Sequence, residues 1–209
     1  MRRPNRRQMY AEQTRADLVA AARKLFVDNG FAHTSVEAIT VAALVSKGTF
    51  YHHFPDKKAM FAELYIDLVQ QVGVLGDATA EAIRAASDEH AMTAASHLTH
   101  TFLRRTIDDP LHRELMVQAP SVLGAQYRHI NDSVAQPPIE RLLTVLAERG
   151  DLRPDVPVPT VARLLLAGLC EGNQIIAAAE DREAALDRTF RAITLLMSGL
   201  AADGVSTRD

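Results

Sequence analysis

The stretch TSVEAITVAALVSKGTFYHHFPDKKAMFAELY, residues 34–65, carries three helix starts in close succession. Thr34 and Glu37, three residues apart, form the pattern of a capping box with Thr34 as the N-cap, and the helix that they open is short. Ser46 begins a second short helix, and Pro55 ends it and precedes a longer one. Two short helices separated by a tight turn are typical of a helix-turn-helix.

An amphipathic helix is predicted just upstream, from about Glu12 to Asn29. Its apolar residues recur at spacings of three and four, which places them on one face. Gly30 suits the left-handed position that follows a helix end. This helix completes a three-helix head, with the apolar stripe formed by Leu18, Ala21, Ala22, Leu25 and Phe26.

The second short helix has the chemistry of a segment that enters a DNA groove. Phe50 and Phe54 lie four residues apart and anchor one face. The other faces offer a cation, hydroxyl groups and imidazole, which suit phosphates and base edges. The candidate contacts are Lys47, Thr49, Tyr51 and His52, with Gly48 allowing close approach and the Ser46 end presenting free amides to phosphate.

Charge is distributed unevenly along the chain. Residues 1–58 contain ten Lys and Arg against five Asp and Glu, a balance of +5, whereas the remainder has 13 against 21, a balance of −8. A basic head on an acidic body indicates that the head meets a polyanion. Residues 1–11 hold Arg2, Arg3, Arg6 and Arg7 without an apolar stripe, so we expect a disordered basic arm.

Over residues 12–65 the chain resembles the DNA-binding domain of the tetracycline-repressor (TetR) family of bacterial transcription regulators, most specifically in VSKGTFYHHF with the following Lys57. The resemblance implies that Ser35, Tyr51 and Lys57 hold phosphates, while Lys47, Thr49 and His52 face the major groove. Family members usually carry Gly where this chain has Leu44. Because a bulky residue resists positive φ, we expect a slightly different turn with DNA binding retained.

The remainder resembles the family's helical ligand-binding and dimerisation domain in architecture. The expected fold is therefore all-α: a helix-turn-helix domain at 12–55 and a regulatory and dimerisation domain at 56–203. Residues 159–202 are predicted to form a homodimer, with Gly168 and Gly172 allowing close backbone contact; packing within one subunit is the alternative. The predicted helices of this part are 56–86, 89–107, 111–118, 121–149, 159–180 and 183–202.

The resemblance implies a repressor that leaves its operator when a small molecule binds. Met, aromatic and sparse polar residues in the middle helices match a mainly apolar pocket, although core packing explains them as well. A cavity on the order of 300 Å³ or more favours this hypothesis; the alternative is a DNA-binding adaptor that is regulated by a protein partner and binds no small molecule. The candidate ligand contacts are His97, Thr101, Phe102, Met116, Tyr127 and Asn173.

Other classes of protein are excluded by what the sequence lacks. It has no Gly-rich phosphate loop, nucleophile elbow or cluster of metal-ligand spacing, so we expect neither an enzyme nor a metal or cofactor site. A single cysteine, Cys170, excludes an internal disulfide. Arg163 and Glu171 interrupt the apolar run at 161–176, so no membrane span is expected, and a cytoplasmic protein is predicted.

Overall fold

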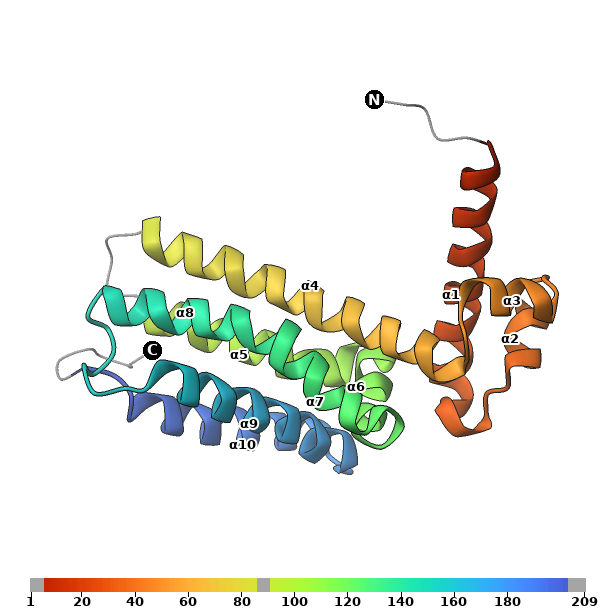
Figure 1. The fold of residues 1–209 in the computed structure, drawn as a ribbon. Helices are drawn as coiled ribbons and strands as arrows, with labels where there is room; N and C mark the ends of the chain where they lie inside the picture. The colour runs from red at the N-terminus through yellow and green to blue at the C-terminus, as the bar shows by residue number, and fades with distance from the viewer. Residues whose placement is uncertain (1–5, 86–90, 203–209) are drawn as a thin grey trace.

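The computed structural model describes residues 6–85 and 91–202, which are almost entirely helical (Figure 1). Helices α1–α3 form a head at one end, α5–α10 form a body, and the long α4 runs from one to the other. The predicted all-α fold is confirmed. The elements are α1 (Arg6–His33), α2 (Val36–Ala42), α3 (Lys47–His53), α4 (Lys57–Ala85), α5 (Ala91–Asp108), α6 (Pro110–Leu123), α7 (Ala125–Ile130), the π-helix η1 (Asn131–Ala135), α8 (Gln136–Glu148), α9 (Val158–Ala178) and α10 (Arg182–Ser198).

Helix α1 begins earlier than predicted, and its predicted end coincides with an interruption. It begins at Arg6, so residues 6–11 are helical and not part of an arm, whereas Arg2 and Arg3 lie outside the described residues. Gly30 has a φ of 73° and a ψ of 166°, which interrupts the helix where the sequence predicts its end. The interruption allows Phe31 to fold back, with its ring centroid 5.7 Å from that of Phe26.

Helix α4 completes the core of the head. The Phe61 ring lies 5.2 Å from Phe31 and 5.7 Å from Phe26, edge-on to both. Rings in this geometry add to the stability that burial provides. The first turns of α4 therefore belong to the packing of the head, and the two parts of the molecule share one continuous helix.

The N-cap of α2 is Ser35, so the capping box predicted at Thr34 is wrong by one residue. The Ser35 hydroxyl accepts a hydrogen bond from the Ala38 amide at 3.0 Å. Thr34 is buried, and its hydroxyl donates to the carbonyls of Leu25 (3.0 Å) and Gly30 (2.8 Å). Thr34 satisfies acceptors at the end of α1 and is therefore not available as a cap.

The turn between α2 and α3 keeps a left-handed residue although it carries no glycine. Leu44 has a φ of 57°, and its side chain is 92% exposed. The bulky residue has therefore not changed the turn in the way that the sequence suggested. Because the exposed side chain gains no packing energy, nothing compensates for the free-energy cost of its left-handed conformation.

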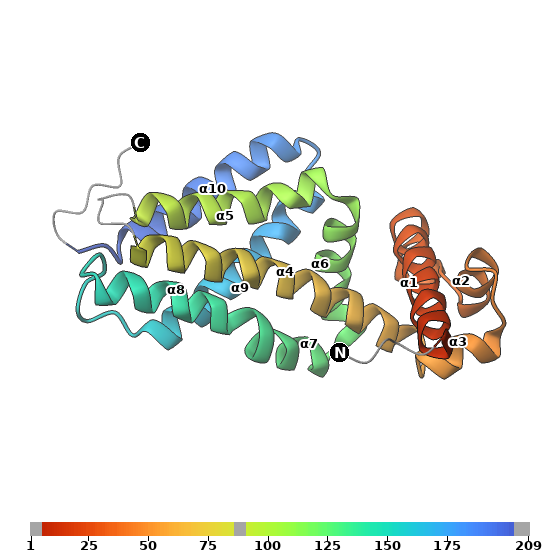
Figure 2. The same ribbon diagram turned by 90° about the horizontal axis from the view of Figure 1, so that it is seen from above.

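In the body, α4 packs closely on the start of α8 (Figure 2). A Cβ atom on Gly73 would lie 3.0 Å from Pro138 Cγ, and one on Gly76 would lie 3.5 Å from Pro138 Cβ. Pro137 and Pro138 have no N–H to donate within the helix. The preceding turn widens into η1, in which the Gln136 amide bonds to the Asn131 carbonyl five residues back.

Helix α6 continues through Pro120, so the predicted end at residue 118 is wrong. A proline at this position removes the hydrogen bond to the carbonyl of Met116. Gln174 of α9 replaces it, because its Nε2 donates to the Met116 carbonyl at 3.0 Å and reaches that of Val117 at 3.3 Å. Gly124, with a φ of 59°, then ends α6, so the single helix predicted over 121–149 is also wrong.

Helices α9 and α10 pack on α5, and only one of the two glycines of α9 faces outward. A Cβ on Gly172 would lie 3.0 Å from Thr189 Cγ2 and 3.1 Å from Leu103 Cδ2. Gly172 thus packs against its own subunit, and its prediction as a dimer contact is wrong. Gly168 has open space around it.

Helix α9 is long and apolar enough to cross a membrane by length and composition, with a mean hydropathy of 1.2 over an 18-residue stretch. The expectation that Arg163 and Glu171 exclude a membrane span by composition is therefore wrong. This is a weak indication, because a helix at the core of a soluble protein meets the same criteria. Here α9 packs on α5, α6, α8 and α10, as a helix of a globular bundle does.

Candidate functional site

Helix α3 is held in place by its cap and its two phenylalanines. The Ser46 hydroxyl accepts from the Thr49 amide at 3.1 Å and so caps the helix. Phe50 and Phe54 are buried, and their rings lie 5.7 Å apart. With this face anchored, the opposite face points to solvent, and Tyr51 is 56% exposed.

The exposed face of α3 holds most of the predicted DNA contacts. Lys47, Gly48 and His52 are exposed, and Thr49 is half-buried with its hydroxyl 2.9 Å from that of Ser46. Lys47 forms an ion pair with Glu37 of α2 at 2.9 Å. Both partners are exposed, so breaking the pair in favour of DNA costs about 1 kcal/mol or less.

Lys57, for which the resemblance implies a phosphate contact, also bonds within the head. Its ammonium donates to the carbonyls of Phe31 (2.5 Å) and Thr34 (2.6 Å) and lies 4.1 Å from the centre of the Phe31 ring. Burial lowers the pKa of Lys57. The cation, unfavourable at the start of α4, is stabilised there by the two backbone carbonyls of Phe31 and Thr34. The neighbouring Lys58 is exposed.

Arg15, which the sequence analysis did not single out, joins the helices of the head. Its guanidinium pairs with Glu63 of α4 and lies 5.0 Å from the centre of the Phe54 ring at the end of α3. Partial burial, then His52 and Arg15, lower the pKa of His53. A surface arginine gives no sequence signal for such a role, because its partners lie far along the chain.

A mainly apolar chamber of about 90 Å³ lies inside the body, next to α4. Phe102 and Met116 line it, as expected, together with residues of α8 and α9. Its volume is below the ~300 Å³ typical of sites for drug-sized ligands. The walls include Tyr65, Val69, Leu98, Thr99, Asn131, Leu142, Leu146, Leu166, Cys170 and Met197.

Three of the predicted ligand contacts lie elsewhere. His97 and Thr101 are exposed on α5, because the face of that helix turned to the chamber carries Leu98, Thr99 and Phe102. Asn173 is buried, but its side chain bonds within the protein. The expectation that these three residues line the chamber is wrong.

Tyr127 lines a second, more open groove of about 750 Å³ at the junction of α7, η1 and α9. The groove shares Asn131, Leu166 and Cys170 with the chamber, so one wall separates the two spaces. Its other walls carry charged residues, namely Arg128, Asp132, Arg163 and Glu171.

The shared wall contains a polar cluster that the sequence analysis missed, apart from Tyr127. The Tyr65 hydroxyl donates to Asn131 Oδ1 at 2.7 Å, and the rings of Tyr65 and Tyr127 lie 5.7 Å apart. Burial, the largest cause, raises the pKa of Tyr127 to about 12 and also raises those of Tyr65 and Cys170. All three groups are therefore uncharged at neutral pH.

A buried histidine, also missed, connects α6 to α5 and α9. His112 Nε2 lies 3.1 Å from Asn173 Oδ1, which also accepts from the Thr106 hydroxyl. Asn173 Nδ2 donates to the Leu169 carbonyl at 2.7 Å, so its oxygen faces His112, and His112 donates from Nε2. His112 Nδ1 is buried without a hydrogen-bond partner in the described part of the chain. Burial lowers the pKa of His112 to about 4.

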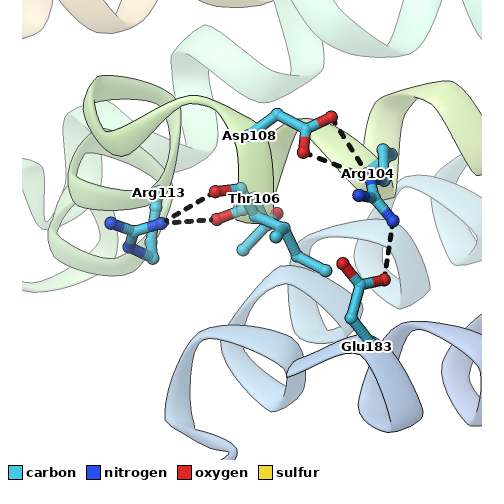
Figure 3. A network of polar contacts seen from close by, with 6 residues as sticks. Arg104, Thr106, Asp108, Arg113 and Glu183 are labelled. Atoms are coloured by element: carbon cyan, nitrogen blue, oxygen red, sulfur yellow. Dashed lines mark hydrogen bonds and ion pairs between the residues drawn. The ribbon is translucent and has the colours of Figure 1, made fainter. Parts of the chain in front are cut away.

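Surface arginines support the same region from outside (Figure 3). Arg113 of α6 donates to the carbonyls of Thr106 and Ile107 at the end of α5, at 2.9 and 3.3 Å. Arg104 bonds to Asp108 on α5 and to Glu183 on α10 at 2.6 Å. These contacts join the end of α5 to α6 and α10.

Two family profiles match the chain. One, described as bacterial regulatory proteins of the tetR family, covers residues 18–64. The other, described as the tetracyclin repressor-like C-terminal domain, covers residues 92–200. The first spans the helix-turn-helix, and the second spans most of the body.

Individual proteins are similar over nearly the full length. The HTH-type transcriptional regulator UidR of Escherichia coli K12 is 29% identical over 191 residues, which is 89% of this chain and 93% of UidR. The crystal structure of a TetR-family regulator from Pectobacterium atrosepticum has a TM-score of 0.74 and 29% identity, covering 96% of this chain and 99% of that one. SmeT, the repressor of a Stenotrophomonas maltophilia multidrug efflux pump, shares the fold at 20% identity with a TM-score of 0.69, and the match covers 93% of this chain and 95% of SmeT. The structure of SmeT in complex with triclosan has a TM-score of 0.67.

Proposed function

Because the chain belongs to the TetR family of bacterial transcriptional regulators, we propose that it is a cytoplasmic repressor that binds an operator as a homodimer and leaves it when a small, mainly apolar molecule binds. The observation that carries DNA binding is α3, which is capped by Ser46, anchored by two buried phenylalanines and exposed on its other face. In this proposal residues 12–55 read DNA, and residues 56–203 form the regulatory and dimerisation domain.

The proposed DNA contacts divide into two kinds. Lys47, Thr49 and His52 reach base edges from α3, and Gly48 allows the helix to approach them closely. Ser35, Ser46 and Tyr51 contact phosphate, for which the capped starts of α2 and α3 offer free amides. Lys57 contacts phosphate from the start of α4, where it also bonds to the carbonyls of Phe31 and Thr34, and the exposed Lys58 supplies a second phosphate contact beside it.

The proposed dimer forms through the exposed stripe of α9 and α10. Leu164 and Ile175 on α9 are 67% and 51% exposed, and Leu195 and Leu196 on α10 are 67% and 73% exposed. Such a patch of large apolar side chains marks an interaction surface. Gly168 lies between Leu164 and Ile175 on the same face of α9 and lets a second backbone approach.

The chamber supports regulation by a small molecule, because Tyr65 and Val69 in its wall belong to the helix that enters the head. The complex of SmeT with triclosan supports the same proposal, since SmeT has the same fold. The small volume of about 90 Å³ favours the second candidate, a DNA-binding adaptor controlled by a protein partner. A small molecule that releases the operator excludes the adaptor.

Gel-shift with the region upstream of the protein's own gene tests the proposal. We expect binding that survives competitor DNA and that is lost when Lys47 and Thr49 are both replaced by Ala. Replacing the exposed Lys24 and Arg23 of α1 by Ala is the matched control and should leave sequence preference unchanged. Equal affinity for the upstream region and random DNA contradicts the proposal. A thermal-shift screen, followed by gel-shift with each hit, tests the release.

A further inference from the structure

We propose that the wall shared by the chamber and the groove is the ligand-recognition centre, and that it selects a small uncharged molecule with an apolar body and one hydroxyl or carbonyl group. This inference rests on the proposed response to a small molecule and names the class to which that molecule belongs. Its polar end is read by Tyr65, Asn131, Tyr127 and Cys170.

These four residues come from four elements and meet at one point. Tyr65 belongs to α4, Tyr127 to α7, Asn131 to η1 and Cys170 to α9. Tyr65 donates to Asn131 at 2.7 Å, while Asn131 and Cys170 line both the chamber and the groove. The remaining walls of the chamber are almost wholly apolar. A ligand in the chamber therefore finds hydrogen-bonding groups chiefly at this wall.

The π-helix explains why Asn131 is available there. Pro137 and Pro138 withhold two amides from the preceding turn, which widens, and the carbonyl of Asn131 bonds to the Gln136 amide. A π-helical turn inside a helix is uncommon and occurs frequently at functional sites. Asn131 is buried, so its amide group is kept for partners within the wall.

The electrostatics of the wall exclude a charged ligand. Burial keeps the two phenols and the thiol in their neutral forms. Beyond the wall, Arg163 already faces Asp132 across the groove at 3.4 Å. The other two charged residues of the groove, Arg128 and Glu171, have opposite signs, so the groove offers no net charge to compensate a carboxylate or ammonium group for its lost hydration.

The size of the chamber limits the apolar body. A cavity of ~150 Å³ accommodates benzene, so a body of one ring enters the chamber of about 90 Å³ only when the apolar side chains of its walls move apart. The more open groove lies on the solvent side of the shared wall.

Three matched probes test the class at pH 7.5: 4-ethylphenol, ethylbenzene and 4-ethylbenzoate. The three molecules share an ethylbenzene ring and differ only in the group opposite the ethyl chain. This group is a neutral hydroxyl in 4-ethylphenol, is absent in ethylbenzene and is an anionic carboxylate in 4-ethylbenzoate. We expect 4-ethylphenol to bind the full-length protein about tenfold more tightly than either other probe, as one well-made hydrogen bond allows. Calorimetry measures the affinities. Equal or tighter binding of ethylbenzene or 4-ethylbenzoate, or no binding of 4-ethylphenol, overturns the proposal.

Tyr127→Phe removes one hydroxyl from the wall. It should weaken 4-ethylphenol several-fold while leaving ethylbenzene unchanged, which a general loss of packing would not do. Tyr10→Phe, on the exposed start of α1, is the matched control. An affinity for 4-ethylphenol that stays at the wild-type value in Tyr127→Phe overturns the assignment.

The single cysteine reports whether a probe sits at the wall. Cys170 is the only thiol in the chain, so alkylation by N-ethylmaleimide followed by mass spectrometry reads this one position. Bound 4-ethylphenol should slow the reaction several-fold. An unchanged rate under saturating probe shows binding elsewhere and overturns the proposal. If a compound of another class releases the protein from its operator, this inference fails while the proposed function stands. If the protein does not bind an operator at all, the proposed function itself fails.

Discussion

At the scale of single residues, Lys57 has a structural role besides its proposed DNA contact. Its ammonium sits between the carbonyls of Phe31 and Thr34, so Lys57→Met should lower the free energy of unfolding by about 1.5–3 kcal/mol, the contribution of a hydrogen bond to a charged group. Urea denaturation measures this. Lys58→Met, on an exposed side chain, should instead weaken DNA binding and leave the unfolding midpoint in place. Equal midpoints for Lys57→Met and the wild type would contradict this role.

His112 makes stability depend on pH. Its pKa is about 4 in the folded chain and about 6.5 when unfolded, so the unfolded state binds the extra proton between these values. The stabilisation is complete above pH 6.5 and is lost as the pH falls toward 4, with a slope of about 1.4 kcal/mol per pH unit for one proton.

His112→Gln keeps a donor for Asn173 but does not titrate. Denaturation curves between pH 7 and 4 should therefore have a smaller slope in this variant, whereas His97→Gln, on an exposed side chain, should behave as the wild type. A variant slope equal to that of the wild type would show that His112 is not the group responsible.

At the scale of elements, the turn before α3 carries a cost that can be removed. Leu44 is left-handed and exposed, so Leu44→Gly should stabilise the head by about 0.5–1 kcal/mol, because glycine adopts positive φ freely. Val41→Gly, on the equally accessible surface of α2, should destabilise by about 1 kcal/mol. Thermal denaturation distinguishes the two, and a lower midpoint for Leu44→Gly than for the wild type would refute the account of the turn.

Gln174 stabilises α6 only because of Pro120. Gln174→Leu should cost about 1 kcal/mol when Pro120 is present, since it leaves the Met116 carbonyl without a donor. In a Pro120→Ala background the helix supplies its own amide, so the same substitution should cost much less. A double-mutant cycle measures the difference, and additive effects would show that the two residues act independently.

The sequence predicted what depends on neighbours along the chain. Periodicity located α4, α5, α9 and α10 within a few residues, and Ser46 was identified as a cap because capping is local. The errors arose where distant residues act. Gln174 lets α6 pass Pro120, Gly172 packs on Thr189 and Leu103, and Asn173 meets His112 across the body. Side-chain periodicity places residues on a face of a helix, but it does not say which element covers that face.

For the whole molecule, the dimer is tested best on the outward face of α9. Gly168→Arg puts a charged side chain where a second subunit is proposed to approach, so light scattering should report a monomer whose circular dichroism spectrum keeps the wild-type helix content. Operator affinity should fall with it, since each operator needs two heads. Gly172→Arg is the internal comparison and should lower the unfolding midpoint by disturbing Thr189 and Leu103. A Gly168→Arg variant that remains dimeric would place the interface elsewhere.

The close contact of Gly73 and Gly76 with Pro138 is a point about which α4 can pivot, like a lever on a fulcrum, with the part of α4 that leads to the head as its arm. At 1.5 Å per residue, the arm from Gly73 back to Lys57 is about 24 Å long. A tilt of about 5° at the fulcrum moves the end of that arm by about 2 Å, a displacement of the size seen for helix shifts in switching proteins. In the proposed dimer, two arms moving in opposite directions would change the span between the heads by about 4 Å, slightly more than the ~3.4 Å rise of one base pair along a DNA strand. A disturbance too small to alter the packing of the body is therefore enough to put two recognition helices out of phase with successive turns of the duplex.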